Sequence, residues 1–521
     1  MPLRRSQARG VRRGRGAAVD RMSTLDAGFY FVEHPGVPMH IGSLAVFEGP
    51  APPYADLSAL FAAKLPKVRR YRQVVRTVPL QMFRPFWVDD EQFELSYHLG
   101  HAAVLPPGGP AQLRELAGRV FGQRLDRDRP LWEAWFVEGL ERGRWALLTK
   151  IHHSMVDGVG GSDLLAELFD VTPESAPPGP PDPWEPEPEP SIAELVVGGA
   201  LDTIAWPVRQ LADLPGVLGR RLPSASDLAI FGRGLTGSAR RLAAPSASSL
   251  NGPISPHRRW TWTDAKLSDV RQIRHAMPRT APVTVNDVLL AAITSGFRDL
   301  LGARGELTDD LVVRSLVPVS LRGSDELEPV SNKISAILVN LPVSEPDPKR
   351  RLRALHASME DLKRTRQAAG AEFLTGLLGF TAPSLLALGS RAAFRIPQPL
   401  VQTVTTNVPG PRFPLYMLGR KLTELYPYVP IGNNLRIGVA IFSYLDRFTF
   451  GITADYRAVP QADLDLLSRG IKRGIAELKP SVTAGRAKAG GRATAGRATA
   501  GRAKAGRVGA GRASAGRGAR G

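Results

Sequence analysis

Cysteine is absent from the 521-residue sequence. This absence excludes disulfide bonds, thiolate metal sites, iron–sulfur clusters and catalysis by a cysteine nucleophile. The sequence also lacks a run of 18 or more apolar residues, so no segment is expected to span a bilayer. No apolar stretch follows the basic N-terminus, which argues against a signal peptide. We therefore expect a cytoplasmic protein.

Acidic residues are absent from both ends of the chain. Residues 1–19 contain six arginines, and residues 481–521 contain ten basic residues. These ends hold 16 of the 19 excess positive charges, so the region between them is nearly neutral. Nucleic-acid binding is therefore not expected, except through the basic C-terminal tail. The start-like sequence at residues 19–22 indicates that residues 1–18 come from an over-extended reading frame.

Proline-rich sequence separates the chain into two parts. Residues 172–190 contain nine prolines, a composition that predicts an extended linker. Strand and helix patterns mix on both sides of it, so the fold class is α/β or mixed α+β. We expect a disordered basic extension at 1–19, a first lobe at 20–171, the linker at 172–190, a helical connector at 191–250, a second lobe at 251–480 and a disordered Ala-Gly-Arg tail at 481–521.

Hydrophobic periodicity predicts most of the individual elements. Extended structure is expected over residues 29–47, with a turn at residues 34–36. Helices are expected at 57–68, 111–125, 163–169, 284–301 and 461–478. Strands are expected at 86–90, 132–137, 145–152, 260–262, 312–319, 334–343, 403–407, 435–444 and 447–453.

The histidine pair His152 and His153 is the most informative feature, because it ends a predicted strand just before a glycine-rich turn. Adjacent strand residues point to opposite faces, so one histidine is expected to face a cleft and the other to brace the strand. Histidine is the side chain best suited to accept a proton near neutral pH. Asp157 follows across the turn and can fix the strand end. A purely structural histidine pair is the alternative.

Several other kinds of site are disfavoured by what surrounds this pair. No second histidine or carboxylate stands at metal-ligand spacing from His153, so no metal is expected. No G-x-S-x-G sequence marks a serine hydrolase. The glycines at 158–161 lack the lysine of a phosphate-binding loop.

The spacing of His152, His153, Asp157 and Gly158 matches HHxxxDG, the signature of the CoA-dependent acyltransferase superfamily, which condensation domains of peptide synthetases share. Six more stretches, in order, make the chain resemble the bacterial wax ester synthase/diacylglycerol acyltransferase family over roughly residues 20–480. They are PMHIGSLAVFEGP, FWVDDEQFELSYHL, PLWEAWFVEGL, TVNDVLLA, VPVSLR and NVPGP. Ser331-Asn332 departs from the Gly-Asn that relatives commonly show.

The resemblance implies two similar chloramphenicol-acetyltransferase-like lobes around a central tunnel. Acyl-CoA would enter from one face and the acceptor alcohol from the other. By motif position His153 would be the general base, which activates the acceptor hydroxyl for direct attack on the thioester. Asp157 would hold the histidine loop through an ion pair, His152 would brace the strand, and Gly158 would form the turn.

Further roles follow from the other motifs of the resemblance. Asn286 is the candidate donor to the oxyanion, because a helix N-terminus adds partial positive charge there. The alternative is that Asn286 only caps its helix. The remaining residues expected to line the substrate site are Pro130, Leu131, Trp132, Asp287 and Asn407.

The expected function is acyl-CoA-dependent esterification that makes triacylglycerol or wax ester, with long-chain acyl-CoA as co-substrate and no cofactor. Lysine provides only 12 of the 68 basic residues, a bias typical of GC-rich actinobacterial genomes, so diacylglycerol is expected ahead of fatty alcohols. Insoluble substrates imply peripheral contact with the inner membrane or lipid bodies. Candidate contacts are residues 191–250, 373–389 and 481–521.

Two alternatives stay open at this point. A condensation-type acyltransferase that takes its acyl group from a carrier protein would share the HHxxxDG motif. A non-catalytic lipid-binding protein associated with lipid bodies would need no base at all.

Overall fold

The computed structural model describes most of the chain between residues 20 and 480. The described ranges are 20–79, 83–155, 167–174, 183–200, 245–278, 282–320, 334–368, 400–432 and 434–480. Contacts divide the chain into one unit of residues 1–478 and another of residues 479–521. Among the described residues, no helix combines the length and the apolar character needed to cross a membrane.

The first part of the chain alternates strands with short helices. Its strands are β1 (Asp20–Arg21), β2 (His40–Phe47), β3 (Gln73–Arg76), β4 (Phe86–Asp89), β5 (Leu99–Ala103), β6 (Trp132–Leu140) and β7 (Arg144–His152). Its α-helices are α1 (Thr24–Val32), α2 (Tyr54–Lys64) and α3 (Pro110–Gly122). A short 3₁₀ helix, η6 (His153–Met155), follows β7 directly.

The second part has longer helices. Its strands are β8 (Arg258–Lys266), β9 (Val313–Ser320), β10 (Ile334–Leu341), β11 (Thr403–Val408), β12 (Tyr416–Met417), β13 (Arg420–Tyr428), β14 (Ile437–Tyr444) and β15 (Arg447–Asp455). Its described helices are α7 (Leu267–Ala276), α8 (Val285–Ala303), α9 (Pro348–Ala368) and α12 (Gln461–Leu478).

Two six-stranded sheets form the two lobes. The first sheet has the order β12-β13-β2-β7-β6-β5, and the second has the order β10-β9-β11-β14-β15-β8. The first sheet is antiparallel except for the pairing of β5 with β6, whereas β11 is parallel to both β9 and β14 in the second. A small third sheet contains β1, β4 and β3.

The second part of the chain contributes two strands to the first sheet. The chain leaves the second sheet after β11, adds β12 and β13 to the first sheet, and returns to the second sheet as β14. Within the first sheet, β13 pairs antiparallel with β2, from Leu422 opposite Phe47 to Tyr428 opposite Gly42. The first sheet is therefore completed by residues from the second part of the chain.

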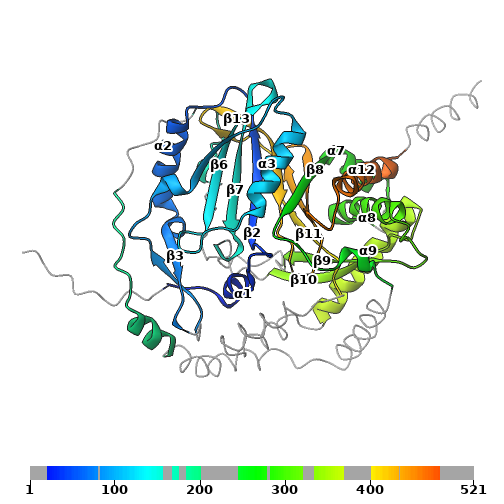
Figure 1. Cartoon of the computed structure of the whole chain (residues 1–521). Coiled ribbons are helices and arrows are strands. Elements are labelled where there is room, and N and C mark those ends of the chain that lie inside the picture. The colour runs from blue at the N-terminus through cyan, green and yellow to red at the C-terminus, as the bar shows by residue number, and fades with distance from the viewer. Residues whose placement is uncertain are drawn as a thin grey trace, which may run out of the picture. The chain divides into compact units, whose positions relative to one another are not determined.

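Helices cover one face of the second sheet and α3 lies beside the first (Figure 1). The core under α7, α8, α9 and α12 is aliphatic, and α8 packs along α12. The helix α3 packs between the first sheet and β8, where Gly118 brings its backbone close to the carbonyl of Arg258. A Cβ at Gly118 would lie 3.1 Å from that oxygen, so a small residue permits the contact between the lobes.

Most predicted elements are confirmed, with one clear error. Residues 29–32 are helical and belong to α1, not to a strand. The helix begins at Ser23, whose side chain accepts a hydrogen bond from the amide of Asp26. This N-cap outweighs the strand preference of the aromatic run Phe-Tyr-Phe-Val. The turn at residues 34–36 and the strand up to Phe47 are confirmed.

The strand β13 lies very close to β15. A Cβ built on Gly451 of β15 would lie 1.7 Å from the carbonyl oxygen of Pro427 in β13. The backbones of Gly451 and Pro427 both belong to sheets, so neither residue can move away easily. Only glycine fits at this position.

We therefore expect Gly451→Ala to lower the free energy of unfolding by about 1–3 kcal/mol, the range of overpacking in a close-packed core. Gly302→Ala in α8 is the matched control, because nothing lies within 4 Å of its Cβ position. In a helix this change should raise stability by about 0.5–1 kcal/mol. Urea denaturation of both variants measures the difference, and equal stabilities would contradict the close approach.

Candidate active site

His152 is the last residue of β7 and is fully buried. Its Nδ1 accepts hydrogen bonds from the backbone amide of Ser154 at 3.1 Å and from the Ser154 hydroxyl at 2.7 Å. Its own amide donates to the carbonyl of Leu131 at 2.9 Å. Burial, helped by the charge of Arg127, lowers the pKa of His152 to about 3. His152 is therefore a neutral residue that holds the strand end.

His153 opens η6 and is only half-buried. Its backbone amide donates to the carbonyl of Met39 at 2.8 Å, which ties it to the segment before β2. Its ring stacks on Phe29 of α1, with 4.0 Å between the centroids and 29° between the planes. Both backbone and ring are thus fixed. The predicted partners Asp157 and Gly158 lie outside the described residues.

A buried carboxylate connects α1 to this strand end. Glu33 accepts a hydrogen bond from the amide of Met39 at 3.2 Å and from Nε of Arg127 at 2.9 Å. Arg127 also donates to the carbonyl of Tyr30 and lies over its ring. Because ion pairs with buried hydrogen bonds have restricted geometry, this group fixes the position of α1 against His153.

Neither α1 nor the residues that anchor it could be recognised from the motifs of the sequence. Phe29, Glu33 and Arg127 belong to none of the motifs that marked the histidine pair. The S-x-x-D pattern at Ser23 and Asp26 was the one local signal for the helix, since it predicts an N-cap just before it.

Two more basic side chains are buried on the same sheet. His40 lies opposite His152 in the pairing of β2 with β7, and its Nε2 donates to the carbonyl of Phe121 at 3.0 Å. Lys150 is fully buried and bonds to Glu133 at 2.9 Å. Burial lowers the pKa of His40 and of Lys150, and the charge of Lys150 further lowers that of His40. His40 is therefore uncharged near neutral pH.

The Pro130-Leu131-Trp132 motif leads into β6 and lies beside the end of β7 in the same sheet. All three residues are buried. The indole nitrogen of Trp132 donates to the carbonyl of Tyr71 at 2.8 Å, and its ring stacks on His98 at 4.7 Å. The motif holds His152 through the carbonyl of Leu131, while its expected contact with substrate stays a prediction.

In the second lobe, the structure brings Asn286 and Asn407 together. Nδ2 of Asn407 on β11 donates to Oδ1 of Asn286 at 3.4 Å. Asn286 lies in the first turn of α8, but the N-cap is Thr284, whose hydroxyl accepts from the amide of Asp287. The alternative that Asn286 only caps the helix is therefore wrong.

Asp287 is nearly fully buried and completes the capping box of α8. Its Oδ2 accepts from the amide of Thr284 at 2.8 Å and contacts Nδ1 of His356 at 2.9 Å. These contacts fix the first turn of the helix. A direct contact of Asp287 with substrate stays a prediction.

Comparison with known proteins places this geometry in a family. Residues 22–289 match the wax ester synthase/diacylglycerol acyltransferase catalytic domain, and residues 330–479 match the WS/DGAT C-terminal domain. A probable diacylglycerol O-acyltransferase (tgs1) of Mycobacterium tuberculosis H37Rv is 39% identical over 474 residues. The alignment covers 88% of this chain and 96% of that protein.

Solved structures agree on the two-lobed fold. The wax ester synthase/diacylglycerol acyltransferase from Marinobacter aquaeolei VT8 is 25% identical, with a TM-score of 0.60 over 89% of this chain and all of that one. The first condensation domain of the CDA synthetase, at 15% identity, has a TM-score of 0.54 over 88% of this chain and 96% of its own. The predicted α/β class with two acyltransferase-like lobes is confirmed.

The depressed pKa of His152 predicts a dependence of stability on pH. In the unfolded chain the histidine has a pKa near 6.5 and binds a proton below that pH. In the folded protein His152 stays unprotonated down to about pH 3. Stability from this group is present above pH 6.5 and is lost as the pH falls. The linkage between proton binding and folding predicts that the free energy of unfolding falls by about 2 kcal/mol between pH 7 and pH 5.

We expect His152→Gln to remove this share of the acid destabilisation, because glutamine can still accept the hydrogen bonds from Ser154 and carries no titrating proton. Urea denaturation at pH 7 and pH 5 measures the effect. His275→Gln, at an exposed position of α7, should leave the wild-type pH dependence unchanged. An unchanged pH dependence in His152→Gln would contradict the neutral, bracing role.

Proposed function

We propose, on the basis that this chain belongs to the wax ester synthase/diacylglycerol acyltransferase family, that it transfers a long-chain acyl group from CoA to the hydroxyl of diacylglycerol, with long-chain fatty alcohols as secondary acceptors. The observation that carries the proposal is the arrangement at the end of β7. A neutral, buried His152 braces the strand, and a half-buried His153 follows with its backbone and ring both fixed.

In this mechanism His153 is the general base. Its imidazole takes the proton of the acceptor hydroxyl as that oxygen attacks the thioester carbonyl. The tetrahedral intermediate then collapses, the carbon–sulfur bond breaks, and the imidazolium returns its proton to the CoA thiolate. No acyl-enzyme forms, which agrees with the absence of any cysteine nucleophile in the chain.

The uncharged state of His152 supports the role of His153 as the general base. A second positive charge beside His153 would lower its basicity, because like charges disfavour protonation. Burial keeps His152 neutral, so it adds no charge when His153 accepts a proton. Asp157 and Gly158 complete the motif, and we propose that they hold the loop after η6.

Asn286 is proposed as a donor to the oxyanion. Its Oδ1 accepts from Asn407, which leaves its NH₂ group directed elsewhere and able to donate. The helix N-terminus beneath it adds partial positive charge, which stabilises developing negative charge. Asn407 then orients the amide, Asp287 fixes the helix turn, and Pro130, Leu131 and Trp132 are proposed to line the substrate site beside His152.

Contact with a lipid surface is part of the proposal, because both substrates and product partition into lipid. The candidate segments at 373–389 and 481–521, and most of the connector at 191–250, lie outside the described residues. Partition of the purified chain onto vesicles that contain diacylglycerol, with and without residues 481–521, would assign or remove the tail as a contact.

Acceptor-dependent release of thiol from palmitoyl-CoA tests the function. Because the chain contains no cysteine, a thiol reagent reports released CoA alone. We expect release with diacylglycerol, weaker release with hexadecanol, and a loss of at least about 100-fold in His153→Ala, the low end of the contribution of a general base.

The control is His152→Gln, which should stay folded and keep far more activity than His153→Ala. Equal release of thiol by His153→Ala and wild type would contradict the assignment of His153 as the base. Release only from an acyl carrier protein would favour the condensation-type alternative, and none from any donor would favour a lipid-binding protein.

Asn286→Ala tests the oxyanion assignment. We expect kcat to fall about 100–1,000-fold, as for the loss of one oxyanion donor, with a much smaller change in KM for palmitoyl-CoA. Asn286→Asp, which keeps the shape but loses the donor, should fall similarly. If Asn286→Asp retains wild-type kcat, the side chain does not donate to the oxyanion.

A further inference from the structure

We propose that Arg258, a buried arginine at the start of β8 in the second lobe, is a positioning residue for His153 in the first lobe. This inference rests on the proposed function, because it concerns the placement of the proposed base. Arg258 belongs to none of the motifs that carry the family resemblance. Its side chain is fully removed from solvent.

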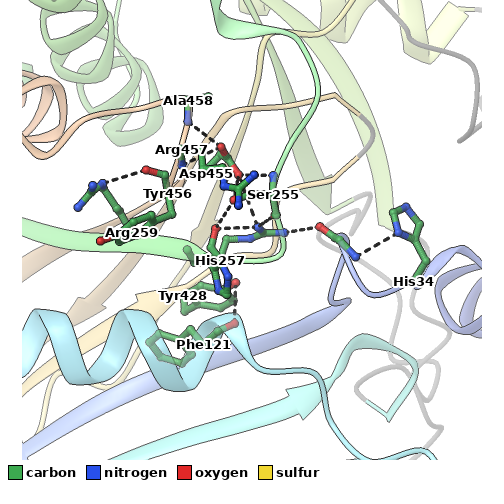
Figure 2. A network of polar contacts seen from close by, with 12 residues as sticks. His34, Phe121, Ser255, His257, Arg259, Tyr428, Asp455, Tyr456, Arg457 and Ala458 are labelled. Atoms are coloured by element: carbon green, nitrogen blue, oxygen red, sulfur yellow. Dashed lines mark hydrogen bonds and ion pairs between the residues drawn. The ribbon is translucent and has the colours of Figure 1, made fainter.

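The guanidinium of Arg258 is held from the side of the second lobe by three groups. Nη1 donates to the carbonyl of Ser255 at 2.5 Å and to the carbonyl of His257 at 3.0 Å, and lies 4.0 Å from the carboxylate of Asp455 (Figure 2). Asp455 is itself fixed by the amides of Ser255 and Ala458. The arginine therefore has one rigid position.

The other end of the same guanidinium crosses to the first lobe. Nη2 donates to the carbonyl of Gly36 at 2.8 Å. Gly36 belongs to the turn between α1 and β2, in which the amide of Val37 donates to the carbonyl of His34. Val37 in turn packs where a side chain on Gly432 of the second lobe would clash, since a Cβ there would lie 2.5 Å away.

We call residues 33–39 the strap, because this segment connects Arg258 to the base. At its start the carboxylate of Glu33 is bound by Arg127. At its end Met39 donates its amide to Glu33 and accepts the backbone amide of His153 at 2.8 Å. In the middle of the strap, the carbonyl of Gly36 accepts the hydrogen bond from Arg258. A change at Arg258 therefore acts on His153 through the carbonyl of Met39.

The arrangement also predicts which substitution is mild. Arginine binds Gly36 on one side and Ser255 and His257 on the other because its fork carries donors in several directions. Lysine keeps the charge near Asp455 but cannot reach both sides at once. Both Arg258→Lys and Arg258→Ala should therefore lower kcat, and Arg258→Lys should lower it less.

The experiment measures kcat and KM for palmitoyl-CoA and diacylglycerol, and the thermal midpoint, for the wild type and both variants of full-length protein. At a temperature where each variant is folded, we expect kcat to fall at least about tenfold in Arg258→Ala, because displacement of a catalytic group by a fraction of an ångström has effects of this size. KM should stay within about twofold, since Arg258 touches no substrate in the mechanism.

Arg304→Ala is the matched control, because Arg304 forms a partly buried ion pair with Asp463 that stays within the second lobe. It should lower the thermal midpoint and keep wild-type kcat. The inference is overturned if Arg258→Ala keeps kcat while losing stability in the same way. If Arg258→Ala does not fold, Arg258→Lys decides: full kcat overturns the inference, and reduced kcat with unchanged KM supports it.

The two hypotheses fail in different ways. A wild-type protein without acceptor-dependent thiol release would overturn the proposed function. An active wild type whose Arg258 variants are equally active would overturn only the role of Arg258.

Discussion

The pairing of β13 with β2 is the contact on which the rest of the structure depends. The buried main chain of β2 must bond on both edges, and its partners are β7 on one side and β13 on the other. Because β13 comes from between two strands of the second sheet in chain order, the first lobe cannot form its complete sheet without the second part of the chain. Only β2 therefore separates β7, which ends at His152, from the strand that joins the lobes.

Several ionisable side chains are buried around the histidine pair, and some of them are bonded to a partner of opposite charge. Lys150 is bonded to Glu133, and Glu33 is bonded to Arg127. Nε2 of His152 lies 3.8 Å from the carboxylate of Glu33, farther than a hydrogen bond, and burial keeps both His40 and His152 neutral. The consequence is an environment in which the proposed base is the histidine that is partly accessible, while its neighbours contribute shape and not charge.

Regular local patterns predicted most of the fold. Alternation over β7 and β15 and helical spacing over α8 and α12 are properties of short windows, and these elements were predicted at nearly their observed bounds. The helix α1 was missed because an aromatic run favours a strand and only the cap at Ser23 indicates otherwise. The pairing of β13 with β2 could not be predicted, since no local pattern specifies a partner several hundred residues away.

The site divides in the same way. His153 and Asn286 were recognisable because each lies in a short motif, whereas the groups that fix them are distant in sequence: Arg258 and the carbonyl that it binds are 222 residues apart. In the proposed direct transfer, base and oxyanion donor act on one tetrahedral centre in one step, so their relative placement enters the rate itself. The proposed base and the proposed donor come from different lobes. The buried pair of Arg258 and Asp455 adds little net stability, but it holds one geometry. A single geometry matters most where the lobes meet, because the proposed reaction uses groups from both lobes.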